Sequence, residues 1–124
     1  MDIIISNSSN VPIFEQIKQE IKKAIINENL KENELLPSIR SLAKDLRVSV
    51  MTVKKSYDEL EQEGFIKTIP GKGSYVAPKN MELLKESQMQ EIEKYIDKII
   101  SISRLANIDK KEILDVFEYL YGED

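Results

Sequence analysis

Two short apolar stripes in the middle of the chain leave few possible folds. The first stripe recurs at i, i+3, i+4 and i+7, the spacing of one helical face: Ile39, Leu42, Ala43 and Leu46. The second stripe begins after a short turn at residues 47–48 and contains Val53, Tyr57 and Leu60. Ser38 and Ser49 are predicted N-caps of the two helices, and Gly64 follows as a natural C′ residue. Two helices joined this closely predict a helix-turn-helix.

The flanking segments predict a winged helix within residues 1–78. Pro12 suits the first turn of a helix, and Ile13, Ile17, Ile21, Ala24 and Ile25 follow it at helical spacing. Residues 2–5 form either a short strand or an extended arm, and residues 30–36 form a connection with one or two buried leucines. After Gly64 two β-prone runs, 65–69 and 74–76, surround a Pro70–Gly73 turn and predict a hairpin.

Residues 79–124 predict a tail of two helices. A long helix is expected from Met81 to about Ala106, and Asp109–Glu112 resembles a capping box that opens a final helix. The long helix has apolar residues at a period near 3.5, the spacing of a seam against another helix. The final helix can cover part of this seam, but so small a unit cannot bury both apolar faces, and a second copy supplies the missing surface. The expected dimer interface contains Ile92, Tyr95, Ile96, Ile99, Ile102, Ala106, Ile113, Val116, Phe117 and Leu120.

The predicted fold is therefore mainly α with a small β-hairpin wing. It consists of a winged helix-turn-helix DNA-binding domain at residues 1–78 and a helical dimerisation tail at residues 79–124.

Two absences exclude most enzyme chemistry. The chain contains no Cys and no His, so disulfides, thiolate nucleophiles, the usual zinc ligand sets and Ser-His-Asp catalysis are excluded. Gly71-Lys72-Gly73 does not match a phosphate-binding loop, because Ser or Thr must follow the Lys. The acid pairs Glu61/Glu63 and Glu91/Glu93 are interpreted as solvated charge. No catalytic residue, metal ligand or cofactor is expected.

The length of the apolar runs and the N-terminus predict a cytoplasmic protein. No stretch approaches the ~20 consecutive apolar residues that span a bilayer. Three apolar residues after Asp2, without a basic lead, do not predict a signal peptide.

The charge is distributed unevenly along the chain. Its formal net value is −4, and residues 1–78 contain equal numbers of basic and acidic residues, so the excess of acids lies in residues 79–124. The segment from Ser38 to Lys55 contains five basic residues and one acidic residue, a local charge of 5 − 1 = +4. Net acidity therefore does not argue against a nucleic-acid partner.

Four motifs in register resemble the DNA-binding domain of the GntR family of bacterial transcriptional regulators. They are Leu36–Ala43, Val48–Tyr57, Glu59–Ile66 and Gly71–Val76, and the opening Pro12–Ile17 resembles the family's first helix. The resemblance covers roughly residues 10–77. With only residues 79–124 beyond it, the chain is similar to the short-tailed YtrA-type subgroup. That resemblance implies dimerisation through the tail and, often, repression of transporter operons.

The resemblance implies a set of DNA contacts. Arg40 matches an arginine that reaches the DNA backbone or a guanine edge, and the alternative for it is a surface ion pair. Ser41 is a weaker candidate for a phosphate contact. Ser49, at a helix N-terminus, either binds phosphate or serves only as a cap. Further expected contacts are Thr52 and Lys54 on the recognition helix, and Gly71, Lys72 and Gly73 at the wing tip near the minor groove.

Two positions depart from the family pattern. Val50 stands where a polar or basic residue is common, so the helix begins with Val50-Met51. We expect Val50 to pack and Met51 to be exposed, where an apolar group reads thymine methyl groups. Arg47 replaces a common glycine of the turn, so it lacks the easy positive φ of glycine and gains a possible phosphate contact.

The chain is expected to be a dimeric transcriptional regulator that binds a palindromic operator and represses its own operon. A transporter-encoding operon is one candidate for that operon. Its expected partners are double-stranded operator DNA and a second copy of the chain, with no membrane partner; a small-molecule effector is left open. The alternative is a winged-helix adaptor that binds protein, which the net acidity would suit.

Overall fold

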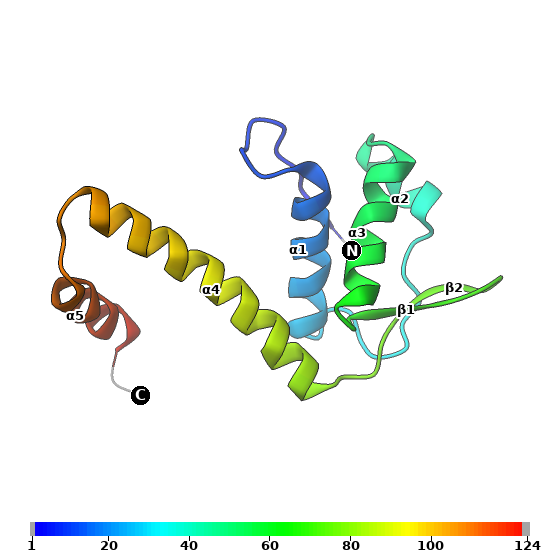
Figure 1. Cartoon of the computed structure of the whole chain (residues 1–124). Coiled ribbons are helices and arrows are strands. Elements are labelled where there is room, and N and C mark those ends of the chain that lie inside the picture. The colour runs from blue at the N-terminus through cyan, green and yellow to red at the C-terminus, as the bar shows by residue number, and fades with distance from the viewer. Residues whose placement is uncertain (1, 123–124) are drawn as a thin grey trace. The chain divides into compact units, whose positions relative to one another are not determined.

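The computed structural model describes residues 2–122, which form five helices and one antiparallel hairpin (Figure 1). The mainly helical winged-helix prediction is confirmed. The described residues divide into two compact units, one up to Leu84 and one from Lys85 onward, so the division between these units lies inside the fourth helix. In chain order the elements are α1 (Ile13–Ile26), α2 (Ile39–Leu46), α3 (Val50–Gln62), β1 (Ile66–Ile69), β2 (Gly73–Val76), α4 (Met81–Leu105) and α5 (Lys110–Tyr121).

The core of the first unit is built around α3, which packs against both α1 and α2. Its apolar stripe is buried as the spacing predicts, because residues three and four apart share one helical face. The expected buried leucines of the connection are Leu30 and Leu36. The other core residues come from every element of the unit except α4: Ile17, Ile21, Leu42, Ala43, Val53, Tyr57, Leu60, Phe65, Ile66 and Val76.

Two buried hydroxyl groups fix α3 to its neighbours. Ser56 Oγ donates a hydrogen bond to the Phe14 carbonyl of α1 at 2.7 Å. Tyr57 Oη donates to the Pro37 carbonyl, just before α2, also at 2.7 Å. Burial raises the pKa of the Tyr57 hydroxyl, so the group stays protonated and keeps its donor role. Both bonds satisfy polar groups that would otherwise be costly to bury.

Two lysines of α1 and two glutamates of α3 form a largely buried ion cluster. The Lys18 ammonium lies 3.0 Å from Glu59 Oε1 and also pairs with Glu63, and Lys22 lies 3.0 Å from Glu63 Oε1. Burial opposes the charged form of Lys18, but hydrogen bonds to Glu63 and Glu59 outweigh burial and raise the pKa of Lys18. The interpretation of Glu63 as solvated charge is therefore wrong.

The hairpin and the N-terminal arm complete the first unit. Strands β1 and β2 pair from Ile66↔Val76 to Ile69↔Gly73. A single bridge between Leu35 and Tyr75 ties the connection after α1 to β2. Residues 2–5 are an extended arm and not a strand, and Ile3 and Ile5 of this arm pack against the core.

The second unit contains most of α4 and the whole of α5. Asp109 caps α5 by accepting a hydrogen bond from the Glu112 amide, as the capping box predicts. No residue of α5 is buried, so α5 does not cover the apolar face of α4 as the sequence analysis expected. Within residues 2–122, none of the helices combines the length and the apolar character that crossing a membrane requires.

We predict that Glu63→Gln lowers the free energy of unfolding by about 2 kcal/mol, because it removes the carboxylate shared by Lys18 and Lys22. The loss is smaller than for a fully buried pair because the Glu63 side chain keeps 23% exposure. Urea denaturation at neutral pH measures it. The Lys18 contribution is present below the usual lysine pKa and is lost as the pH rises through the raised pKa of the folded state.

The matched control is Glu61→Gln, two residues away on the exposed side of α3. It should change stability by less than about 0.5 kcal/mol. Equal effects of the two substitutions would contradict the cluster's role.

Candidate nucleic-acid interface

The side of α3 opposite the core is open to solvent. Met51 is 70% exposed and Lys54 is exposed, while Thr52 is half-buried. Val50 is 38% exposed, so the expectation that it packs is wrong. At the first turn of α3 both apolar side chains therefore face solvent, where thymine methyl groups are the matching feature of a major groove.

The N-terminus of α3 is capped by Ser49. Its Oγ accepts a hydrogen bond from the Thr52 amide at 3.0 Å and lies 2.7 Å from Thr52 Oγ1. Ser38 caps α2 in the same way by accepting from the Ser41 amide at 3.1 Å. Both predicted N-caps are confirmed, and a phosphate contact by Ser49 stays a prediction.

Two lysines of α3 have partners that the sequence analysis did not name. Lys54 Nζ lies 2.7 Å from Asp58 Oδ2, an i,i+4 pair with both groups more than half exposed. Such a pair contributes little and yields readily to a phosphate. Lys55 Nζ lies 3.9 Å from the ring centroid of Phe14 on α1. The i,i+4 spacing could have revealed the first contact, whereas the second depends on how α1 packs against α3.

Helix α2 presents Arg40 and Ser41 to solvent. Arg40 forms none of the ion pairs found among residues 2–122, so the surface ion pair considered for it is not formed. An unpaired guanidinium group can donate hydrogen bonds to two acceptors on one partner molecule.

The turn between α2 and α3 depends on one residue in the left-handed region. Arg47 has φ 58° and ψ 45°, and its amide bonds to carbonyls in the last turn of α2. This conformation costs a residue with a Cβ about 1–2 kcal/mol, and a glycine would avoid that cost. Arg47 is exposed, so the side chain that replaces glycine projects into solvent.

The tip of the wing is short, exposed and positively charged. Gly71 and Gly73 have φ values of 77° and 119°, and the Lys72 amide donates to the Ile69 carbonyl at 2.9 Å to close the turn. A Cβ on Gly73 would come within 3.2 Å of Leu35 Cδ1. Glycine on both sides leaves Lys72 on a loop that can approach a phosphate backbone closely.

Two groups of cations in the first unit differ in whether they are paired. Lys18 and Lys22 are neutralised inside the α1–α3 cluster. By contrast, four exposed cations on α2, the turn and the wing have no ion pair among residues 2–122: Arg40, Lys44, Arg47 and Lys72. These four unpaired cations therefore lie on the segments that are expected to face DNA.

The second unit exposes the apolar side chains expected at a dimer interface. On α4, Ile92, Tyr95, Ile96, Ile99 and Ile102 are each between 43% and 61% exposed. On α5, Val116, Phe117 and Leu120 are between 55% and 75% exposed, while Ile113 is half-buried and Ala106, after α4, is exposed. Further exposed apolar residues not named from the sequence are Met89, Ile100, Leu105, Ile108, Leu114, Tyr119 and Tyr121. Large exposed apolar patches are typical of interaction sites.

Comparison with known proteins gives a consistent result. The family profile described as bacterial regulatory proteins, gntR family, matches residues 13–76. The HTH-type transcriptional repressor YtrA of Bacillus subtilis is 33% identical over 111 residues, which cover 90% of this chain and 85% of that protein.

Two solved structures share the fold. A transcriptional antiterminator from Listeria monocytogenes superposes with a TM-score of 0.75 at 30% identity, covering 100% of this chain and 96% of that one. YtrA from Sulfolobus acidocaldarius, a GntR-family transcription factor, gives a TM-score of 0.60 at 33% identity over 73% of this chain and 95% of its own.

We predict that Arg47→Gly lowers the affinity for DNA and leaves the stability of the fold nearly unchanged. The substitution relieves the left-handed strain at the turn but adds freedom to the unfolded chain, so the free energy of unfolding should stay within about 1 kcal/mol. The affinity for duplex DNA should fall, and its salt slope should decrease by about one, because a phosphate contact is lost. Urea denaturation and fluorescence anisotropy measure the two effects.

Arg47→Lys is the control, since it keeps a positive charge on the same backbone and should retain most of the affinity. An unchanged salt slope for Arg47→Gly would show that this side chain does not reach the DNA.

Proposed function

This chain belongs to the GntR family of bacterial regulatory proteins, and on that premise we propose that it is a dimeric repressor that binds a palindromic operator through its winged helix. As a member of that family it is a DNA-binding transcription regulator and not an enzyme. The observation that carries the proposal is the exposed side of α3, flanked by unpaired cations on α2, the turn and the wing.

The proposed contacts divide by chemistry. Arg40 forms hydrogen bonds with a guanine edge or with the DNA backbone, because its guanidinium group can donate to two acceptors. Met51 meets thymine methyl groups, and Thr52 and Lys54 face the major groove beside it. The remaining contacts are to phosphates and position the protein without reading sequence: Ser41, Arg47, Ser49 and the wing tip at Gly71, Lys72 and Gly73.

The exposed apolar faces of α4 and α5 support a homodimer through residues 79–124. Because α5 buries none of its residues in the single chain, both faces need a partner, and a second copy offers the same surfaces. A two-fold axis would present two α3 helices to DNA. Their half-sites would then form a palindrome about one helical turn apart, or a multiple of it.

The regulatory role follows from relatives of similar length. Bacillus subtilis YtrA is named a repressor, and repression is what we propose for this chain. Control of its own operon, with a transporter operon as one candidate, extends that proposal. Bound to chromosomal operators, the protein would work in the cytoplasm.

We predict that Arg40→Ala weakens operator binding by about 1–3 kcal/mol if the side chain reaches a base, and leaves the fold intact. The fold should be unaffected because Arg40 is exposed and has no ion pair among the described residues. Anisotropy titration measures the affinity, and thermal unfolding checks the fold.

The matched control is Lys23→Ala, which removes an exposed cation from α1, outside the proposed interface. It should leave the affinity nearly unchanged. A sharp drop in melting temperature for Arg40→Ala with unchanged affinity would show that Arg40 is structural.

We predict that Ile99→Glu converts the protein to monomers with folded winged helices, because it buries an unpaired carboxylate in the proposed interface. Operator affinity should fall steeply, since the two half-sites are no longer linked in one binding event. Sedimentation velocity of the purified variant measures the mass.

Ser101→Glu places the same charge at an exposed polar position of α4 and should remain dimeric. A persistent dimer for Ile99→Glu, or a wild type that is monomeric at micromolar concentration, would overturn the role of the tail.

A further inference from the structure

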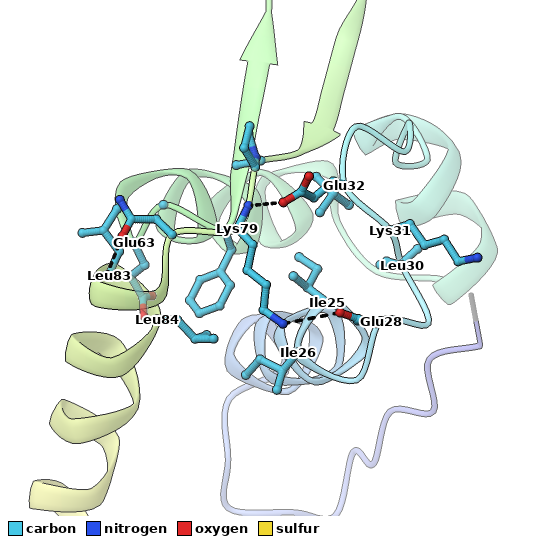
Figure 2. A pocket seen from close by; sticks show the side chains of 16 residues that line it. Ile25, Ile26, Glu28, Leu30, Lys31, Glu32, Glu63, Lys79, Leu83 and Leu84 are labelled. Atoms are coloured by element: carbon cyan, nitrogen blue, oxygen red, sulfur yellow. Dashed lines mark hydrogen bonds and ion pairs between the residues drawn. The ribbon is translucent and has the colours of Figure 1, made fainter.

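The first unit contains a cavity of about 260 Å³ that the proposed function does not use (Figure 2). It lies where four segments meet: the end of α1, the connection that follows it, the base of the hairpin and the first turn of α4. All of its lining residues belong to the unit that ends at Leu84. None of the residues proposed to contact DNA or to form the dimer interface lines it.

The wall of the cavity is mostly apolar. Its lining includes Ile25, Ile26, Leu30, Phe65, Val76 and Leu84. Among the described residues, no buried side-chain nitrogen or oxygen is left without a hydrogen-bond partner, so no unsatisfied buried side-chain group is available to an occupant. An apolar surface of this kind binds a ligand by excluding water and not by directed hydrogen bonds.

A glycine brings the first turn of α4 to the cavity. Gly64 follows α3 with φ 85°, and a Cβ at this position would lie 2.9 Å from Leu83 Cδ1. That separation is too short for a real contact, so any other residue here would displace the Leu83 side chain and would also be strained by the positive φ. Leu83 and Leu84 can therefore complete the apolar wall beside Phe65.

The charges at the mouth are matched within the protein. The Lys79 backbone amide donates to Glu32 Oε1 at 2.6 Å, and the Lys79 ammonium lies 3.4 Å from Glu28 Oε1. Glu63 is held by Lys18 and Lys22. Figure 2 shows the Lys31 ammonium pointing away from the cavity. The mouth therefore presents little net charge to an incoming molecule.

We propose that this cavity binds a small, uncharged, apolar molecule. The size limit follows from the volume, since a cavity of about 150 Å³ accepts benzene and drug-sized ligands need about 300 Å³ or more. A molecule of one or two rings fits between these limits. The mostly apolar wall and the small net charge of the mouth favour an uncharged, apolar occupant over a charged one.

Lys79 is the movable part of the mouth. Its ammonium contact to Glu28 is long, and the two side chains are 42% and 71% exposed. Exposed pairs of this kind contribute little to stability, so the side chain can move aside without disturbing the fold.

The test uses 6-propionyl-2-dimethylaminonaphthalene, an uncharged two-ring probe whose fluorescence rises in apolar surroundings, on the full-length protein. We expect saturable binding at one probe per chain. Leu83→Asp should weaken this binding at least about tenfold, because it replaces an apolar wall residue by a carboxylate. Ala77→Phe, which fills the cavity from β2's C-terminal side, should weaken it similarly.

Met81→Asp is the matched control, because it places the same charge in the same helical turn outside the cavity lining. It should bind the probe as the wild type does. An acidic residue suits the first turn of a helix, so both aspartate variants should fold, and circular dichroism verifies this.

Three results would overturn the inference. The first is the absence of saturable probe binding. The second is binding that Leu83→Asp and Ala77→Phe, both shown to be folded, leave unchanged, since the probe would then sit elsewhere, such as on the exposed faces of α4 and α5. The third is equal or tighter binding of the anionic two-ring probe 5-dimethylaminonaphthalene-1-sulfonate, which would contradict the uncharged class.

Discussion

The attachment of α3 to α1 determines where every group of the candidate DNA interface lies. Ser56 bonds across to the Phe14 carbonyl, and the Lys18, Lys22, Glu59 and Glu63 cluster joins the two helices further along. Because this inner side is both apolar and fully satisfied, the opposite side of α3 can remain polar and exposed without loss of stability. The side chains expected to read DNA therefore project from a helix whose position does not depend on them.

The same arrangement explains why a chain with net charge −4 can still present a cationic surface. Lys18 and Lys22 are neutralised inside the core cluster. On α3, Glu59 pairs with Lys18 and Asp58 pairs with Lys54. On α2, the turn and the wing, four exposed cations have no ion pair within residues 2–122: Arg40, Lys44, Arg47 and Lys72. What DNA would meet is this local distribution and not the sum over the chain.

Local signals in the sequence predicted most of the fold, because caps, helical spacing and glycine turns act within a few residues. Ser38, Ser49 and Asp109 cap helices where expected. Long-range pairing was missed: Lys22 and Glu63 are 41 residues apart. The i,i+4 spacing of two lysines on one helix and two glutamates on another was the available signal. The exposure of Val50, the uncovered face of α4 and the cavity all depend on how separate segments pack, which no single stretch of sequence encodes.

The central claim is that the first unit binds duplex DNA through its unpaired cations, two copies at a time. The most direct test is the affinity of the wild-type protein for a duplex oligonucleotide, measured by anisotropy from about 50 to 200 mM salt. Four unpaired cations per protomer (Arg40, Lys44, Arg47 and Lys72) make eight per dimer, so the logarithm of the affinity should fall linearly with the logarithm of salt concentration, with a slope between about −4 and −7. Failure to bind duplex, or an affinity that salt leaves unchanged, would contradict the account and favour a protein-binding adaptor.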